Sequence, residues 1–191
     1  ERVEYQLTKV CKDRTASDVP VGAFLSGGID SSSIVLSLVK QGINLNTFSI
    51  GFHDKKMNEA GHASTVADKL STKHNQMYIG ENECISEVKN IVSCYDEPFS
   101  DPSLLPTFLL SKFAKNKITV ALAGDGADEL FGGYYRYFMA NRFNKLIIDS
   151  PVFFKNLIYV IITKTPKWVW ENIGQILSKK YGKRQFADKL L

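Results

Sequence analysis

The chain has 191 residues, 44% of them hydrophobic and 23% charged, with a formal net charge of +4. That length and composition are ordinary for one soluble globular domain with a sizeable core. The longest apolar run, residues 157–162, is too short to span a bilayer, so we expect no membrane partner. Cys11, Cys84 and Cys94 are widely spaced, which predicts reduced thiols in the cytoplasm and not a disulfide framework or a zinc site.

The positive charge is concentrated near the end of the sequence. Residues 151–191 hold eight Lys/Arg and two Asp/Glu, whereas residues 1–150 hold 16 and 18. A basic tail can bind nucleic acid. Because Ile, Leu and Trp are interleaved with these charges, the pattern favours amphipathic helices, and we expect no nucleic-acid partner. Trp168 and Trp170 are expected on a packing face, or on an exposed sticky face if the rest of the domain is absent.

Short apolar runs alternate with helical patterns along the chain. Val3, Leu7 and Val10 recur at helical spacing and predict a short opening helix. The apolar runs predict four strands, at 19–25, 45–52, 76–79 and 118–123. Helical patterns are present at 34–42, 59–70, 85–95 and 104–114, and from about 127 onward. The region after Asn144 is predicted to be helical, with breaks at Pro151 and Pro166.

Strands that alternate with helices predict an α/β fold: an open, mostly parallel twisted sheet with helices on both faces, followed by a helical C-terminal segment. In such sheets, ligands bind outside the carboxyl ends of the strands. Two turns that combine glycine with acidic residues, at 26–32 and 124–129, each follow a predicted strand directly. We therefore expect both turns at the same edge of the sheet, facing each other.

The first turn, SGGIDSSS at residues 26–33, has the composition of a phosphate site. A helix that begins after a glycine turn presents free N–H groups and a partial positive charge to an anion. Gly27 and Gly28 let the backbone come close to a ligand. The serine hydroxyls add donors, at Ser26, Ser31 and Ser32. The run is neither a Walker A loop nor a GxGxxG fingerprint, yet it suits pyrophosphate.

Asp30 is the residue in this turn that needs an explanation. A carboxylate beside phosphates requires a cation between them, and Mg²⁺ binds through one or two carboxylates plus phosphate oxygens. Asp128, in the second turn, is the candidate second carboxylate. Mg²⁺ there would stabilise a departing pyrophosphate. The alternative is that Asp30, or a neighbouring serine, only caps the next helix.

Both turns resemble known motifs. SGGIDSS resembles the SGGxDS signature of the ATP pyrophosphatases, which cleave ATP between its α and β phosphates. Residues 124–134, GDGADELFGGY, are similar to the GDGxDELFGGY run of the asparagine synthetase family. DEPF at 96–99, DPS at 101–103 and DVPVG at 18–22 also fit that family. The match covers roughly residues 1–142.

The resemblance implies an adenine nucleotide α-hydrolase-like synthetase domain over residues 1–145, with a helical extension over residues 146–191. The family's domain adenylates the side-chain carboxylate of aspartate with Mg-ATP. Ammonia, derived from glutamine in the parent enzyme, then displaces AMP. The products are asparagine, AMP and pyrophosphate, so the activity implied is that of a ligase that forms a C–N bond. The implied partners are aspartate, ammonia, the parent's glutaminase domain and, as a further candidate, a second copy of the chain.

The resemblance also assigns roles by matching motif positions. The residues that would hold pyrophosphate are Ser26, Gly27, Gly28, Asp30, Ser31 and Ser32. Those that would meet the adenine, ribose or AMP moiety are Phe24, Ile50, Ala123 and Gly124. Asp30 and Asp128 would bind Mg²⁺, and Asp125 would face the acceptor amino acid or the ammonia. The expected catalytic set is therefore Asp30, Asp125 and Asp128, although Asp125 could instead cap the next helix.

Several features depart from the family pattern. Ala123 stands where a serine is common, and Ala127 where Gly or Ser is usual. The glutamine-hydrolysing members begin with a cysteine and an amidotransferase domain, and they carry a catalytic lysine beside an EVRxPFLD-like run. We find neither the cysteine with its amidotransferase domain nor the lysine segment in this sequence. The role of that lysine is not assigned to Lys179, Lys180, Lys183 or Lys189. We therefore expect a fragment of a longer enzyme, weak or inactive alone.

Three other interpretations stay open. A related amidotransferase or a β-lactam synthetase would share the chemistry and use another acceptor. A non-catalytic nucleotide-binding module would keep the two turns and lack turnover. Nucleic-acid binding through the basic tail would be strongly salt-dependent. Glu129 is expected either to contact the residues that bind the ligand, without binding the ligand itself, or to act as a charge at a helix N-terminus.

Overall fold

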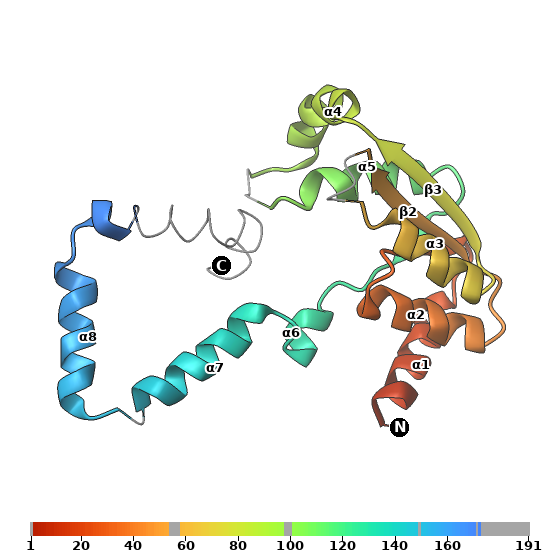
Figure 1. Cartoon of the computed structure of the whole chain (residues 1–191). Helices are drawn as coiled ribbons and strands as arrows, with labels where there is room; N and C mark the ends of the chain where they lie inside the picture. Colours follow the sequence, from red (N-terminus) through yellow and green to blue (C-terminus); the bar gives the residue numbers. More distant parts are fainter. Residues whose placement is uncertain (1, 54–57, 98–100, 149, 171, 173–191) are drawn as a thin grey trace. The chain divides into compact units, whose positions relative to one another are not determined.

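The computed structural model describes residues 2–53, 58–97, 101–148, 150–170 and 172 (Figure 1). The chain divides into two compact units, Glu1–Asp125 and Gly126–Leu191, and each is described by itself. The division at residue 145, which was drawn from the extent of the motifs, stays a prediction.

A four-stranded sheet forms the centre of the first unit. Its strands are β1 (Val21–Phe24), β2 (Asn46–Phe52), β3 (Lys73–Ile79) and β4 (Val120–Leu122). They lie in the order β3-β2-β1-β4, and all three pairings are parallel. The expected parallel sheet is therefore confirmed, and the carboxyl ends of its strands share one edge.

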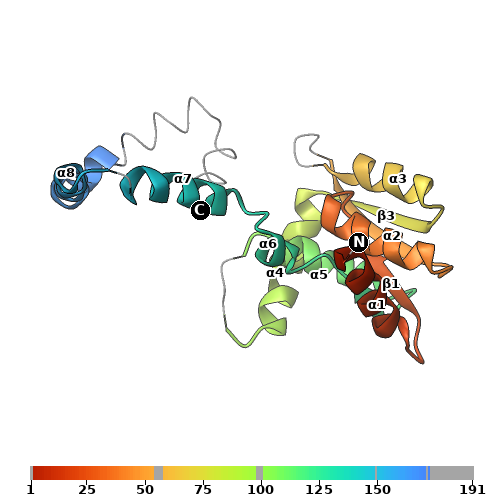
Figure 2. The ribbon, with the colours of Figure 1, turned by 90° about the horizontal axis from the view of Figure 1, so that it is seen from below.

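Helices cover both faces of this sheet (Figures 1 and 2). They are α1 (Arg2–Thr15), α2 (Ile29–Lys40) and α3 (Ala60–Lys69) on one side and α5 (Leu104–Ala114) on the other, and α4 (Glu81–Cys94) packs against α5. α1, α2 and α3 share one core cluster, in which Leu25, Val35 and Leu38 are almost completely buried. α5 packs on the opposite face, where Phe48 meets Phe113 edge to face.

The opening helix forms where it was expected, but it packs through a different face. Leu7 contacts the core, whereas Val3 and Val10 are 58% and 50% exposed. Cys11, one turn after Leu7, is buried in their place. The i, i+4 pair Leu7–Cys11 therefore faces α2. Because α1 packs against one neighbouring helix, its buried face is narrower than the spacing of its apolar residues suggested.

β3 begins three residues earlier than the apolar run predicted, and its added residues are polar. His74 lies between two buried hydroxyls of β2, with Nδ1 2.9 Å from Thr47 Oγ1 and Nε2 3.1 Å from Ser49 Oγ. Gln76 Nε2 donates to the backbone oxygen of Ala60, the first residue of α3, at 2.9 Å. Because these polar groups find partners, the strand tolerates residues that an apolar pattern misses.

The second unit contains α6 (Ala127–Phe131), α7 (Tyr135–Ile148) and α8 (Val152–Lys164). The predicted break at Pro151 is confirmed, since Pro151 caps the start of α8. Many large apolar side chains of α7 and α8 are exposed, and so are Trp168 and Trp170, at 64% and 42%. The four lysines considered above lie outside the described residues. Within the described part of the chain, no helix has the length and apolarity needed to cross a membrane.

The His74 contacts predict how the stability of the first unit depends on pH. Burial lowers the pKa of His74, against a smaller opposing effect of the Asp68 charge. The fold therefore favours the neutral ring. The stability that this preference contributes is complete above the unfolded pKa of about 6.5 and is lost as the pH falls below that pKa. We expect His74→Asn to lose less unfolding free energy than the parent between about pH 7 and about pH 5. Urea unfolding across that range measures the difference, and equal losses in the two chains would contradict it.

Candidate functional site

The first turn begins directly where β1 ends. Leu25 donates its N–H to Phe48 O at 2.8 Å, which is the last sheet hydrogen bond before the chain bends. Gly27 then adopts a left-handed φ of +83°, and Gly28 returns to an extended conformation as the residue before α2. Only glycine adopts the left-handed conformation without strain, so the sequence specifies a sharp reversal at the carboxyl edge of the sheet.

Gly27 approaches α3 more closely than any side chain would allow. A Cβ placed on Gly27 would lie 2.6 Å from the carbonyl carbon of His62 and 2.7 Å from the nitrogen of Ala63. In the structure the missing side chain of Gly27 makes room for a helix, and the contact of its backbone with a ligand stays a prediction. Gly28 is different, because it is exposed and a Cβ there would meet only Ser26 Oγ, at 3.3 Å.

Two of the predicted donors hold the turn itself. Ser31 Oγ accepts from the N–H of Ser26 at 3.2 Å and is hydrogen-bonded to Ser26 Oγ at 3.0 Å. Ser26 Oγ in turn accepts from the N–H of Gly28 at 3.2 Å. Ser32 behaves differently, since its hydroxyl oxygen is buried and makes no hydrogen bond within the described part of the chain. A buried, unpaired hydroxyl is costly, so Ser32 has an unmet hydrogen bond beside this turn among the described residues.

The N-terminus of α2 lacks the side-chain cap that was expected as an alternative role for Asp30. Gly28 occupies the cap position, and no side chain accepts from the first turn. The first helical bond runs from Ser32 N–H to Gly28 O at 3.1 Å. The preceding N–H groups therefore have no helical partner, and the partial positive charge of the helix end stays open to an anion. The Asp30 side chain is exposed at this end.

The second turn reaches the same place from β4. A Cβ on Gly124 would lie 3.0 Å from the nitrogen of Ser31 and 3.1 Å from the Cβ of Asp30. Gly124 thus lies directly against the first turn of α2, as the shared sheet edge predicts. Ala123 is half-buried beside it, and Asp125 is exposed.

The rest of the second motif, in the other unit, is tied together by its own residues. Gly133 donates to Asp128 O at 3.0 Å, and a Cβ on Gly133 would collide with Asp128 Oδ1. The Tyr134 hydroxyl donates to Glu129 Oε1 at 2.6 Å, which lowers the pKa of Glu129 and raises that of Tyr134. Arg136 covers the Tyr134 ring at 4.1 Å. The observed role of Glu129 is therefore to close this loop.

Other expected residues are placed less specifically. Phe24 ends β1 and packs partly into the α5 core, and Ile50 is half-buried two residues before the end of β2. Among the described residues, no group of three or more His, Cys, Asp or Glu could hold a metal. A cation at this edge would therefore need oxygens from its ligand, which is how Mg²⁺ binds with nucleotides.

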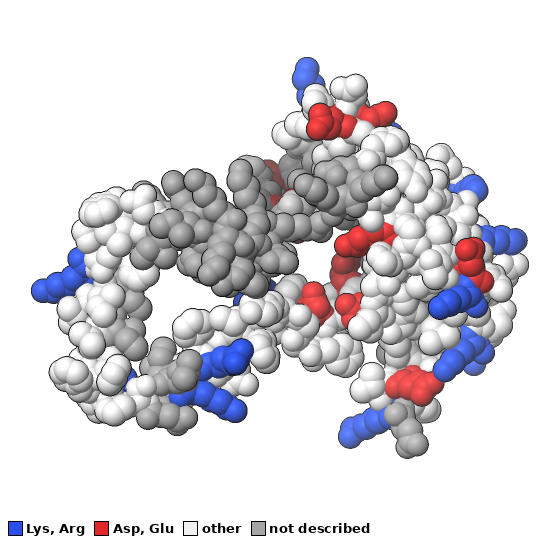
Figure 3. Space-filling view, in the orientation of Figure 1, with Lys and Arg blue, Asp and Glu red and all other residues white. Residues whose placement is uncertain are grey.

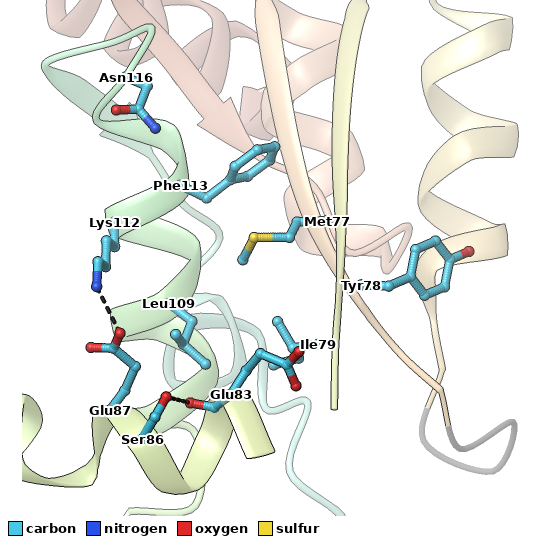
Figure 4. A pocket seen from close by; sticks show the side chains of 10 residues that line it. All are labelled: Met77, Tyr78, Ile79, Glu83, Ser86, Glu87, Leu109, Lys112, Phe113 and Asn116. Atoms are coloured by element: carbon cyan, nitrogen blue, oxygen red, sulfur yellow. Dashed lines mark hydrogen bonds and ion pairs between the residues drawn. The ribbon is translucent and has the colours of Figure 1, made fainter. Parts of the chain in front are cut away.

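A pocket of about 310 Å³ lies elsewhere, between β3, α4 and α5 (Figure 4). Met77, Leu109 and Phe113 point into it, and at its rim Lys112 Nζ contacts Glu87 Oε1 at 2.7 Å. None of its lining residues belongs to either glycine-acid turn. The pocket is therefore separate from the candidate site.

In the space-filling view, charged side chains of both signs are scattered over the first unit, with acidic ones over α4 (Figure 3).

The fold is a parallel α/β sheet with two glycine-acid turns at its carboxyl edge, and comparisons identify its family. The family model for asparagine synthase matches residues 2–189. The chain belongs to this family.

Relatives of known name agree with this assignment, and one solved structure has a similar fold. Asparagine synthetase (glutamine-hydrolysing) 1 of Bacillus subtilis (strain 168) is 46% identical over 121 residues, which cover 63% of this chain and 19% of the relative. Putative asparagine synthetase (glutamine-hydrolysing) 2 of Methanocaldococcus jannaschii is 42% identical over 134 residues, 69% of this chain and 26% of the relative. The chain thus spans about a fifth to a quarter of these proteins. The NH3-dependent NAD synthetase of Campylobacter jejuni has a TM-score of 0.51 at 16% identity, covering 70% of this chain and 59% of that one, which confirms the expected adenine nucleotide α-hydrolase-like fold.

The contact between Gly27 and α3 predicts a large difference between two glycine substitutions. Gly27→Ala adds a side chain at a left-handed φ and presses it against the α3 backbone. Gly42→Ala adds one at a similar φ of +78° with nothing within 4 Å. The left-handed conformation costs about 1–2 kcal/mol in both, and the backbone overlap adds at least about 1 kcal/mol for Gly27→Ala alone. Urea unfolding of the two variants measures the difference. Equal losses of unfolding free energy would show that the α3 backbone moves away from residue 27 at little cost.

Proposed function

We propose that this chain carries the ATP site of an asparagine-forming ligase. ATP would adenylate the side-chain carboxylate of aspartate, and ammonia would displace AMP from that intermediate, leaving asparagine, AMP and pyrophosphate. The observation that carries the proposal is the uncapped N-terminus of α2, held against Gly124 within the two motifs of the family. The names of the relatives support asparagine as the product.

The first turn would bind the pyrophosphate part of ATP. Free N–H groups at the start of α2, the exposed backbone of Gly28 and the unpaired hydroxyl of Ser32 are the donors that support this role. Ser26 and Ser31 hold the turn in shape, and where Ser31 donates to Ser26 Oγ, the hydrogen of the Ser26 hydroxyl is left for a phosphate oxygen. The exposed Asp30 carboxylate and Asp128 would hold Mg²⁺, which neutralises charge on the leaving pyrophosphate.

The second turn would position the reacting groups. Gly124 keeps the second turn against the first turn of α2, and we propose that its backbone there meets the AMP moiety. Ala123 would contribute its backbone only, as would Phe24 and Ile50 beside the adenine or ribose. Asp125 is exposed and would face the acceptor or the ammonia. Because no protein nucleophile is needed, the rate gain would come from orientation and electrostatics.

The proposed nitrogen source comes from the names of the relatives. Those given above are glutamine-hydrolysing enzymes, so we propose that a glutaminase domain of the whole protein supplies ammonia to this site. Cytoplasmic location and pairing with a second copy stay predictions from the sequence.

Product analysis tests the proposal. The protein encoded by the complete gene, given Mg-ATP, aspartate and ammonia, should form asparagine, AMP and pyrophosphate in equal amounts. Asp30→Asn should reduce turnover and Mg²⁺-dependent ATP binding by about tenfold or more, since even residues behind a metal's ligands have effects of that size. Asp68→Asn, which removes an exposed carboxylate from α3, is the matched control.

Each outcome has a distinct meaning. AMP and pyrophosphate formed only with another acceptor would keep the chemistry and change the product. ATP binding without turnover would indicate a nucleotide-binding module. ADP and phosphate as products, or no ATP binding at all, would show that the phosphate site is wrong.

A further inference from the structure

The phosphate turn carries an acid and no base. Residues 26–33 contain Asp30 and neither Lys nor Arg, unlike a Walker A loop with its lysine. Bound pyrophosphate would be highly negative, and the end of α2 supplies only about half a charge. Any full positive side-chain charge must therefore come from outside the motif.

α3 is the element that the structure brings to this turn. A Cβ on Gly27 would lie 2.8 Å from the Cβ of His62, so the His62 side chain leaves its helix on the side that faces the turn. Ala63, beside it, is completely buried and fixes this end of α3 in the core. The His62 side chain is exposed and has no hydrogen bond, ion pair or ring contact to the described residues.

We infer that His62 binds the pyrophosphate portion of the nucleotide. This inference rests on the proposed function and adds to the site a residue from α3 that neither motif contains. An imidazole can donate a hydrogen bond from either ring nitrogen, and it carries a positive charge when protonated, so it suits a phosphate oxygen. From a Cβ that lies beside Gly27, the imidazole ring can turn toward the neighbouring Gly28, whose backbone is exposed.

Among the described residues, the other charged side chains near this point are acidic and do not replace His62. Glu59, at the cap position of α3, and Asp30, in the first turn of α2, are both acidic and exposed. Neither forms an ion pair with His62 in the structure as described. An imidazole flanked by these acids, with no side-chain partner among the described residues, is available for an anionic ligand that arrives with its own Mg²⁺.

A comparison of ATP with AMP tests the inference in the full chain. AMP lacks the β and γ phosphates, so a residue that contacts them should affect ATP alone. We expect His62→Ala to weaken Mg-ATP binding by about fivefold, the effect of one exposed charged contact, and to leave AMP binding unchanged. His62→Arg should restore ATP binding and make it more sensitive to salt. Lys69→Ala, which removes a charge two turns along α3, should change neither affinity.

Titration calorimetry with each nucleotide gives these values, and thermal unfolding shows whether the variants keep the fold. Equal weakening of ATP and AMP, or a failure of His62→Arg to restore ATP binding, would overturn the role of His62 while leaving the ATP site intact. Unchanged ATP binding in His62→Ala would do the same. If the parent chain binds neither nucleotide, the proposed function itself fails.

Discussion

The site depends on two close approaches of backbone to backbone at the carboxyl edge of the sheet. Gly27 meets α3, and Gly124 meets the first turn of α2. Strand order explains both contacts, because β1 lies between β2 and β4. The turn that leaves β1 is therefore flanked by α3, which comes after β2, and by the turn that comes after β4. A side chain at either glycine would push the turn away, so the open end of α2 exists only while both positions lack a Cβ.

Much of this arrangement is readable in the sequence. Alternating strands and helices indicated the parallel sheet, and the bounds of α5 match the prediction at both ends. The position of both glycine-acid turns at one edge could be inferred from order alone. Two of the misses have one physical cause: polar or half-buried residues were assigned from their own residue type, whereas the residues they contact decide their place. β3 was predicted too short because the partners of His74 lie on β2, and the buried face of α1 could not be known without α2.

The motif indicates which residues belong to the turn, and the structure separates their roles. Ser26 and Ser31 bond to each other and to the turn's backbone, whereas the hydroxyl of Ser32 is buried and unpaired among the described residues. All are serines in one short run, so no pattern of residue types could distinguish them. The same holds for Gly27 and Gly28: one packs against a helix, and the other leaves backbone exposed to solvent.

The polar surface under α3 connects fold and site. Gln76 of β3 holds the backbone oxygen of Ala60, and a Cβ on Gly51 would lie only 2.9 Å from the Ala60 Cβ. The first turn of α3 is therefore held against the sheet by β2 and β3, whose sequences carry neither motif. That same turn presents His62 and Ala63 to Gly27. A change in the polar residues of β3 would thus reach the turn at residues 26–33 through one turn of α3, without altering either motif, because the helix end and that turn are in direct contact.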